Sequence, residues 1–233
     1  MDKEKMVQRM FSSAAKRYDL NNSVLSFGIH HYWKRHAVEL TNAQEGNNVL
    51  DVCTGTADIA ILLAKRVGSS GHVTAVDLNR EMLEVGKKKV KQAGLEKVIT
   101  CSQGNAESLK FGKNKFDTVT VGFGVRNVSH LEKAFSEMYR VTKPGGRVVC
   151  LEFTQPERPI FRYIYDFYSF KLLPAVGTII SRDKTGIYNY LPDSIRKFPT
   201  AVKLRELMLQ VGFSSVEYEM LSGGIVAVHV GVK

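Results

Sequence analysis

Three short segments of the sequence carry side chains suited to holding a nucleoside. DVCTGTAD (residues 51–58) contains Gly55, which allows a tight turn whose backbone can approach a ligand closely. Asp77 follows 22 residues after Gly55, close to the separation at which an acidic residue meets ribose hydroxyls in nucleotide-binding α/β proteins. NAE (residues 105–107) begins with Asn105, whose amide can both donate and accept hydrogen bonds at a purine edge. Together these residue types predict a site for an adenosine-containing cofactor.

Each of the three segments also has a simpler interpretation. A lone glycine after a strand is weak evidence, Asp is a favoured N-cap residue for a following helix, and residues 105–107 could form an ordinary polar turn. Their coincidence at the ends of three successive predicted strands favours the nucleoside site, because ligands of open α/β sheets bind at such ends. The sequence lacks the complete glycine pattern of a dinucleotide-binding turn. This absence argues against a nicotinamide cofactor.

The elements that must position these residues alternate between strands and helices. Short β-branched runs are followed by longer helical segments, which is typical of βαβ units that build a mostly parallel sheet. A final helix is expected at about 200–211, and a sharp turn at KPGG (143–146). We predict strands over 48–54, 72–77, 98–104, 116–124 and 147–153, and helices over 58–67, 80–92 and 131–142.

The end of the chain departs from the parallel pattern. Residues 214–221 and 225–232 have the character of strands and are separated only by SGG, and so tight a connection requires antiparallel pairing. The predicted fold is therefore α/β, a Rossmann-like seven-stranded sheet of the class I methyltransferase type with an antiparallel terminal strand. We expect a single domain over residues 1–233, with a helical N-terminal lid (1–45) and a substrate-side insertion (156–199).

Composition and charge limit the class of protein. The 233-residue chain has a net charge of +10, which favours an anionic partner such as a phospholipid surface or a nucleic acid without choosing between them. Cys53, Cys101 and Cys150 are scattered along predicted strands and indicate no disulfide framework. The cysteines and six histidines show no metal-ligand spacing, so we predict no metal. The charged N terminus and the lack of a long apolar run predict a cytoplasmic location.

Several longer motifs resemble those of the quinone C-methyltransferases of menaquinone and ubiquinone biosynthesis. The most restricted are FGVRNV (123–128), YDFYSF (165–170) and LLPAVG (172–177), whereas KPGG is common to many methyltransferases. Further similar stretches are FSSAAKRYDL (11–20), SFGIHHYWK (26–34), DVCTGTAD (51–58), MYRVTKPGGR (138–147), LEF (151–153), YNYL (188–191), SIR (194–196) and GGIVAVH (223–229).

The resemblance implies a reaction and a cofactor. S-adenosylmethionine (SAM) would donate a methyl group to a ring carbon of a demethylated prenyl quinol, whose tail would stay in the lipid. The expected reaction converts demethylmenaquinol to menaquinol, and the 2-polyprenyl-6-methoxybenzoquinol step of ubiquinone synthesis stays open as a second one.

The resemblance also implies which residues bind SAM. The family's contacts fall on Thr56, Asp77, Asn105 and Ala106, with Gly122 at the end of the fourth strand lining the same cleft. Cys53 and Ala57 replace two glycines of the usual methyltransferase signature, although both positions keep small residues. The complete set of cofactor-binding residues that we predict is Asp51, Gly55, Thr56, Asp77, Leu78, Asn105, Ala106 and Gly122.

Methylation of a ring carbon requires that a ring hydroxyl begins to ionise, because an aromatic carbon is otherwise a poor nucleophile. Arg126 is placed to stabilise the resulting phenolate oxygen, and Asn127 to hold a neighbouring oxygen. A bound water, or Tyr18, His30 or His31 from the N-terminal lid, would accept the proton. The simpler interpretations are a structural ion pair between Arg126 and the following helix, and two partly exposed histidines at a helix start.

The partners follow from the same residues. Residues 159–174 form an aromatic, largely apolar helical pattern with basic neighbours, which predicts core, a wall of the quinone channel or a shallow membrane contact. We expect a prenylated quinol and a transient, peripheral contact with the inner face of a membrane, with a homodimer left open. Nucleic acid is not expected, because VGFGVRN (121–127) follows the fourth strand in place of an Asn-Pro-Pro-Tyr-like motif. Methylation of another small lipophilic acceptor and a non-catalytic SAM- or lipid-binding regulator are the competing functions.

Overall fold

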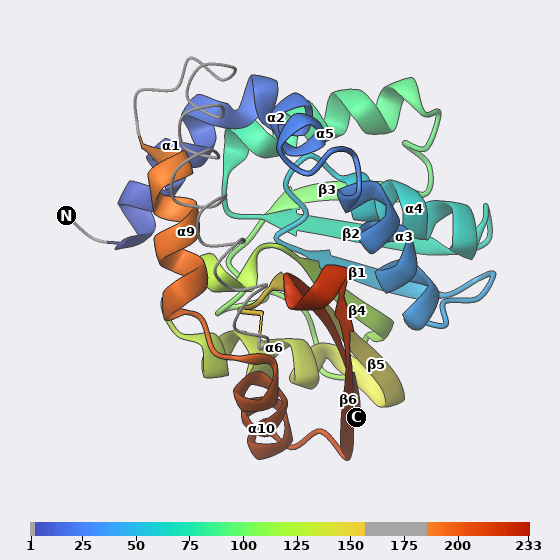
Figure 1. Cartoon of the computed structure of the whole chain (residues 1–233). Coiled ribbons are helices and arrows are strands. Elements are labelled where there is room, and N and C mark those ends of the chain that lie inside the picture. The colour runs from blue at the N-terminus through green and yellow to red at the C-terminus, as the bar shows by residue number, and fades with distance from the viewer. Residues whose placement is uncertain (1–2, 157–185) are drawn as a thin grey trace.

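The computed structural model describes residues 3–156 and 186–233, in which helices cover both faces of one sheet (Figure 1). The predictions made for residues 159–174 lie outside the described residues. The strands are β1 Asn48–Val52, β2 His72–Asp77, β3 Ile99–Gln103, β4 Phe116–Gly122, β5 Thr142–Phe153, β6 Ser215–Leu221 and β7 Val226–Val232. The helices are α1 Lys3–Ala14, α2 Tyr18–Leu25, α3 His30–Leu40, α4 Asp58–Val67, α5 Arg80–Gln92, α6 Leu131–Val141, α9 Ile187–Lys197 and α10 Ala201–Val211, with short 3-10 turns η1 Ala15–Arg17, η2 Val125–Asn127 and η4 Ser222–Gly224.

The strands form a seven-stranded sheet in the order β3-β2-β1-β4-β5-β7-β6. β1 to β5 pair in parallel, whereas β7 runs antiparallel to both β5 and β6. The chain moves outward from β1 to β3 and then returns to β4 on the other side of β1. Such a switch point is where ligands bind in open α/β sheets. The predicted seven-stranded fold with an antiparallel last strand is confirmed.

The KPGG segment differs from its prediction. We expected a sharp turn before a strand over 147–153, but these residues belong to β5, which begins at Thr142. The register between β4 and β5 shifts after the pair Phe116–Thr142, and Gly145 has a φ of 75°. Because glycine adopts positive φ without a steric clash, the extra residues are accommodated as an irregularity inside the strand.

The core lies on both faces of the sheet. Adjacent strand residues point to opposite faces, so Val49 packs with Leu63 of α4, whereas Leu50 packs with Phe135 and Met138 of α6. Figure 1 shows α4 and α5 on one side of the sheet and α6 and α10 on the other. This two-faced burial explains why the central strands are almost continuously apolar.

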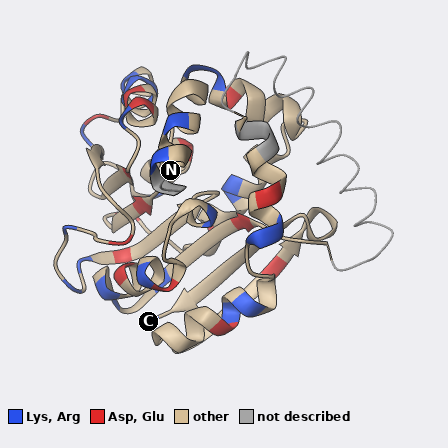
Figure 2. Ribbon diagram, turned by 90° about the vertical axis from the view of Figure 1, so that its left-hand side faces the viewer, with Lys and Arg blue, Asp and Glu red and all other residues tan. Residues whose placement is uncertain are grey.

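The N-terminal helices cover the ends of the strands where the cofactor residues were predicted. α1 contacts α5 and α9, and α1 and α9 lie side by side in Figure 1 although they are far apart in the sequence. On α3, Trp33 packs against Phe123 and Phe153 with ring centroids 6.2 and 6.1 Å away. Among the described residues, no helix is long and apolar enough to cross a membrane. In the view of Figure 2, basic and acidic residues are interspersed over most elements.

Candidate active site

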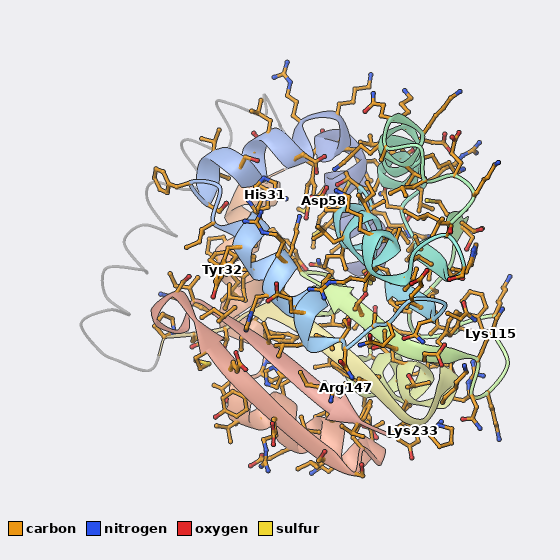
Figure 3. All side chains as sticks on the ribbon, turned by 90° about the vertical axis from the view of Figure 1, so that its right-hand side faces the viewer. His31, Tyr32, Asp58, Lys115, Arg147 and Lys233 are labelled. Carbon is orange, nitrogen blue, oxygen red and sulfur yellow. The ribbon has the colours of Figure 1, made fainter. Side chains whose placement is uncertain are left out.

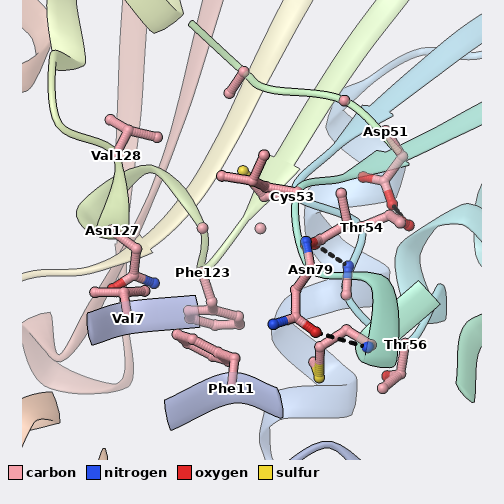
Figure 4. Close-up of a pocket in the computed structure, with 18 of the residues that line it drawn as sticks. Val7, Phe11, Asp51, Cys53, Thr54, Thr56, Asn79, Phe123, Asn127 and Val128 are labelled. Carbon is pink, nitrogen blue, oxygen red and sulfur yellow. Dashed lines mark hydrogen bonds between the residues drawn. The ribbon is translucent and has the colours of Figure 1, made fainter. Parts of the chain in front are cut away.

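A cavity lies at the carboxyl ends of β1, β2 and β4, beside the N-terminal helices. Figure 4 shows Val7, Phe11, Phe123 and Asn127 on one side and Asp51, Thr54, Thr56 and Asn79 on the other. What we call the polar side consists of Asp51, Thr54, Gly55, Thr56, Asp77, Asn79 and Asn105. What we call the apolar side consists of Val7, Phe11, Tyr18, Phe123, Asn127 and Val128. The eight residues predicted to bind the cofactor all line this cavity: Asp51, Gly55, Thr56, Asp77, Leu78, Asn105, Ala106 and Gly122.

The Asp77 carboxylate is held in one orientation at the end of β2. Its Oδ2 accepts a hydrogen bond from the Gly55 N–H at 2.8 Å, and its Oδ1 accepts one from the Asn79 N–H at 2.8 Å. The helix cap at this point is Asn79, whose Oδ1 accepts from the Met82 N–H, so capping of α5 does not account for Asp77. Burial raises the pKa of Asp77, and the two backbone hydrogen bonds oppose that rise. Each carboxylate oxygen retains a lone pair for a ligand hydroxyl.

The loop after β1 has an alternating left-handed backbone. Cys53, Gly55 and Ala57 have φ values of 55°, 56° and 66°. Cys53 and Ala57 are the residues that replace glycines of the methyltransferase signature, and they adopt the conformation that glycine would provide. A non-glycine residue in this region costs roughly 1–2 kcal/mol. The surrounding packing therefore imposes the glycine-like loop path on two residues that do not favour it.

Asp51 shapes the same loop from inside the sheet. Its two carboxylate oxygens accept hydrogen bonds from Thr54 Oγ1 at 2.6 Å and Thr120 Oγ1 at 2.7 Å. Burial nevertheless raises the pKa of Asp51 to about 6, against the lowering by these hydroxyls. This carboxyl group therefore anchors the turn, while the Asp77 carboxylate at the strand end faces the cavity.

Two other predicted positions have clear local roles. Asn105 Oδ1 accepts a hydrogen bond from the Glu107 N–H at 2.8 Å, so Asn105 both forms the polar turn that was the simpler interpretation and lines the cavity. A Cβ atom on Gly122 would lie 2.3 Å from Ile59 Cδ1. A side chain at residue 122 would therefore require the Ile59 side chain of α4 to shift.

An ionic cluster joins the N-terminal helices to the loop after β1. Asp19 of α2 accepts hydrogen bonds from Thr56 Oγ1 and Lys89 Nζ, both at 2.6 Å. Asp58, at the start of α4, pairs with Lys34 of α3 at 2.7 Å and also with Lys89. Despite burial, these lysines lower the pKa of Asp58 to about 2. Figure 3 shows Asp58 between the N-terminal helices and α4, so the cluster fastens one side of the cavity to the other.

The apolar side contains two of the residues predicted for the acceptor. Tyr18 of α2 lines the cavity, and burial raises the pKa of its hydroxyl to about 12. Asn127 also lines the cavity, and its Oδ1 accepts a hydrogen bond from Tyr190 Oη of α9 at 3.2 Å. Tyr18 therefore keeps its proton near neutral pH and can serve as a hydrogen-bond donor, but not as the base.

Arg126 lies behind the cavity lining and is buried. Its Nε donates to Ser194 Oγ of α9 at 2.8 Å, and its guanidinium forms an ion pair with Glu152 of β5. The backbone N–H of Arg126 also donates to Glu152 Oε2 at 3.2 Å. Burial raises the pKa of Glu152, while the Arg126 charge opposes that rise. The sequence had suggested an ion pair with the following helix as the alternative, and the pair instead joins η2 to β5.

His30 is buried outside the cavity lining. Its Nδ1 lies 2.8 Å from Ser26 Oγ, and its ring centroid lies 3.9 Å from that of His31. Burial, together with the charges of Lys34 and His31, lowers the pKa of His30 to about 4. The imidazole is therefore neutral near pH 7 but is a weak base. It also lies outside the residues that line the cavity. Within the described ranges, no cluster of side chains could hold a metal ion.

Sequence reasoning missed four residues that matter to this geometry: Lys34, Thr54, Asn79 and Glu152. A usable signal existed for Asn79, since an Asn before the helix over 80–92 is a favoured N-cap. Glu152 stood within the LEF motif, as a charged residue in an apolar strand. Lys34 gave no such signal, because its place beside Asp58 depends on how α3 packs against α4.

The sheet order and an acidic residue at the end of β2 facing the cavity define a class I SAM-dependent methyltransferase fold. A SAM-dependent methyltransferase from Aquifex aeolicus superposes with a TM-score of 0.58 at 18% identity, covering 99% of this chain and 98% of that one. A possible histamine N-methyltransferase from Thermotoga maritima gives 0.68 at 18% identity over 97% and 99%. The [4+2]-cyclase SpnF gives 0.67 at 18% identity over 87% and 81%, so the fold alone does not determine the reaction.

The chain belongs to the ubiE/COQ5 methyltransferase family, whose model matches residues 1–233. It is 46% identical over 232 residues to the ubiquinone/menaquinone biosynthesis C-methyltransferase UbiE of Francisella tularensis subsp. novicida, covering 100% of this chain and 92% of that protein. The protein of the same name from Legionella pneumophila strain Corby is 44% identical over the same shares. The predicted family is confirmed, and the protein is a SAM-dependent C-methyltransferase.

Proposed function

We propose that this protein transfers a methyl group from SAM to a ring carbon of a demethylated prenyl quinol. Demethylmenaquinol is the first acceptor, and 2-polyprenyl-6-methoxybenzoquinol is the second. The observation that carries the proposal is the full-length similarity to relatives named for ubiquinone and menaquinone biosynthesis. The polar side of the cavity suits the cofactor, and the apolar side suits the acceptor.

The polar side suits the nucleoside and amino acid parts of SAM. The Asp77 carboxylate, oriented by Gly55 and Asn79, would accept hydrogen bonds from the two ribose hydroxyls. Asn105 and Ala106 would flank the adenine ring. When bound, SAM supplies an electrophilic methyl group on a sulfonium. The protein's task is then to place the acceptor carbon in line with that methyl and to exclude water.

The apolar side suits a flat, lipophilic ring. Phe11 and Phe123 provide apolar surface on this side (Figure 4), and Tyr18 and Asn127 place a hydroxyl and an amide among them. The methyl would replace a ring hydrogen, S-adenosylhomocysteine would leave, and the released proton would pass to water. The protonated Tyr18 hydroxyl would donate a hydrogen bond to a ring oxygen and so stabilise its developing negative charge. In this proposal Arg126 acts from behind the lining, where its pairing with Glu152 and Ser194 holds the loop that carries Asn127.

The proposal also covers the organisation of the chain. We propose one domain over residues 1–233, in which residues 1–45 act as a lid whose closed position is maintained by Asp19, Lys34 and Lys89. Methylation of another small lipophilic acceptor is the second candidate. The observation in its favour is the apolar side of the cavity, because an apolar surface would also accept other flat rings.

The decisive experiment incubates the purified protein and deuterium-labelled SAM with each demethylated quinol under reducing conditions. Mass spectrometry should find the label on a ring carbon of the menaquinol product. Deletion of the gene should cause the demethylated quinone to accumulate, and the intact gene should reverse this. Binding of SAM without methylation of either quinol would refute the choice of acceptor while leaving the cofactor site in place.

A further inference from the structure

The exposed apolar side chains of the described residues are concentrated in one short segment. Of six large hydrophobic residues with high exposure, five lie between residues 20 and 32: Leu20, Val24, Phe27, Ile29 and Tyr32. The sixth, Val202, lies on α10. Single exposed apolar residues are ordinary on a protein surface, whereas a group of them indicates an interaction site. We name these five residues the apolar patch.

The patch lies on the turn between α2 and α3. Leu20 and Val24 are four residues apart on α2, which places them on one face of that helix. Phe27 and Ile29 occupy the turn, and Figure 3 shows Tyr32 on α3 at the surface of the molecule. Backbone hydrogen bonds from Phe27 to Val24 and from Tyr32 to Ile29 hold this turn in a defined shape. The five side chains are therefore presented by an ordered structure.

Phe27 is presented at a conformational cost. It is 89% exposed and has a φ of 51°, a left-handed conformation that is unfavourable for a bulky side chain. The conformation is that of a helix C-terminus, since the Gly28 N–H donates to the Ser23 carbonyl at 2.8 Å, and glycine or asparagine is the usual residue there. The fold gains little burial from this ring, so a partner outside the protein accounts better for its position.

The charges around the patch indicate the nature of that partner. Lys16, Arg17 and Arg35 flank the patch in the sequence and are exposed. The acidic residue within 16–35 is Asp19, and its carboxylate is engaged by Thr56 and Lys89. An apolar surface edged by cations complements a lipid bilayer with anionic headgroups, into which aromatic and aliphatic side chains insert while Lys and Arg contact phosphate.

The same helices connect the patch to the cavity. α2 carries Tyr18 in the cavity lining and Leu20 and Val24 exposed to solvent. On α3, Trp33 packs against Phe123 of the apolar side, while Tyr32 is exposed. We infer that the α2–α3 turn docks on an anionic phospholipid bilayer and so holds the apolar side of the cavity close to the lipid. The consequence of this docking for catalysis rests on the proposed function. A prenylated acceptor that enters the cavity from the bilayer would expose little of its tail to water.

The first test is Phe27→Asn, measured by co-sedimentation with vesicles of phosphatidylglycerol and phosphatidylcholine. Asn tolerates left-handed φ well, so the thermal midpoint should equal or exceed that of the wild type. Binding to the vesicles should weaken at least about tenfold, as expected for removing one buried aromatic side chain. Vesicles of phosphatidylcholine alone should bind the wild type more weakly, and added salt should lower binding to the anionic vesicles.

A matched pair of valines supplies the control. Val24 in the patch is 39% exposed and Val202 on α10 is 42% exposed, and both lie on helices. Val24→Ser should weaken vesicle binding a few-fold, and Val202→Ser should leave it unchanged. Equal binding by the wild type, Phe27→Asn and Val24→Ser would overturn the inference. A wild-type dimer that Phe27→Asn dissociates would also overturn it, since the patch would then be a contact between two copies of the chain.

Activity assays separate this inference from the proposed function. With a short-tailed, water-soluble demethylnaphthoquinol, Phe27→Asn should have the wild-type kcat and KM. With a long-tailed quinol in anionic vesicles, its KM should rise about tenfold, in line with the loss of vesicle binding. If neither quinol is methylated but Phe27→Asn still abolishes vesicle binding, the proposed acceptor is wrong and the docking surface stands.

Discussion

The two sides of the cavity are built in different ways. The polar side is made by residues at the ends of β1, β2 and β3, where backbone N–H groups of adjacent loops orient the central carboxylate, as Gly55 and Asn79 do for Asp77. The apolar side is made by α1, α2 and the end of β4, and it is supported by pairs that join distant segments, such as Arg126 with Glu152 and Ser194. The polar side therefore depends on local backbone geometry, and the apolar side on tertiary packing.

Substitutions on the two sides should therefore have different effects on SAM binding and on stability. Local hydrogen bonds survive most distant substitutions, so damage to the polar side should appear as weaker SAM binding with little loss of stability. A buried pair between distant segments contributes to both folding and function, so damage to the apolar side should lower stability first. Four experiments test this contrast.

The largest expected effect comes from the buried pair. Glu152→Leu should lower the free energy of unfolding by roughly 3–5 kcal/mol, because it leaves the Arg126 charge buried without a partner. The double variant Arg126→Met with Glu152→Leu should recover most of that loss, since an apolar pair fills the same space without a charge. Urea unfolding of the single and double variants measures both values. A single variant as stable as the wild type would show that the apolar side does not depend on this pair.

Next in size is Asp77→Asn on the polar side. The loss of hydrogen bonds to a charged group costs about 1.5–3 kcal/mol, so the Kd for SAM should rise roughly 10- to 150-fold in calorimetry. Asp117→Asn is the matched control, because Asp117 binds the Asn48 N–H and Lys143 at the far end of β4. SAM binding by Asp77→Asn equal to that of this control would remove Asp77 from the cofactor site.

Two buried histidines allow a comparison by pH. Burial lowers the pKa of both His30, beside the apolar side, and His229, in β7, to about 4. A lowered pKa means that the stability is fully present above about pH 6.5 and is lost as pH falls toward 4, by roughly 2 kcal/mol per histidine at pH 5. His229→Gln should reduce the pH dependence of global unfolding. His30→Gln should reduce the acid-induced hydrogen exchange of α2 and α3, and no change there would separate His30 from the lid.

The smallest effect concerns the ionic cluster between the two sides. Asp19→Asn weakens the contacts with Thr56 and Lys89, and because this pair is partly exposed the stability should fall by less than about 1 kcal/mol. SAM should nevertheless dissociate a few-fold faster in stopped-flow measurements, since these contacts join α2 to the loop after β1 at the cavity. Glu84→Gln, which removes the exposed pair with Lys87, should leave the dissociation rate unchanged. Equal rates for both variants would contradict a closing role for Asp19.

How much of the site could be predicted follows the same division. Gly55, Asp77 and Asn105 were identifiable because parallel strands of a sheet end at one edge, so their spacing along the chain implies proximity. The loop conformation at Cys53 and Ala57 was harder, since neither residue favours positive φ. The turn expected at KPGG was wrong because β5 continues through these residues as an irregularity, with the register to β4 shifting between Thr142 and Arg147.

From the sequence one could predict the order of elements, the seven-stranded sheet with its antiparallel last strand, and three residues of the polar side, Gly55, Asp77 and Asn105. The reason is that periodicity and turn residues act over a few positions of chain. Tertiary structure alone decided that Glu152 and Ser194 hold Arg126, that Lys34 meets Asp58, and that five apolar side chains of the α2–α3 turn stay exposed. These outcomes depend on which surfaces remain after distant segments pack, and spacing along the chain carries no record of that.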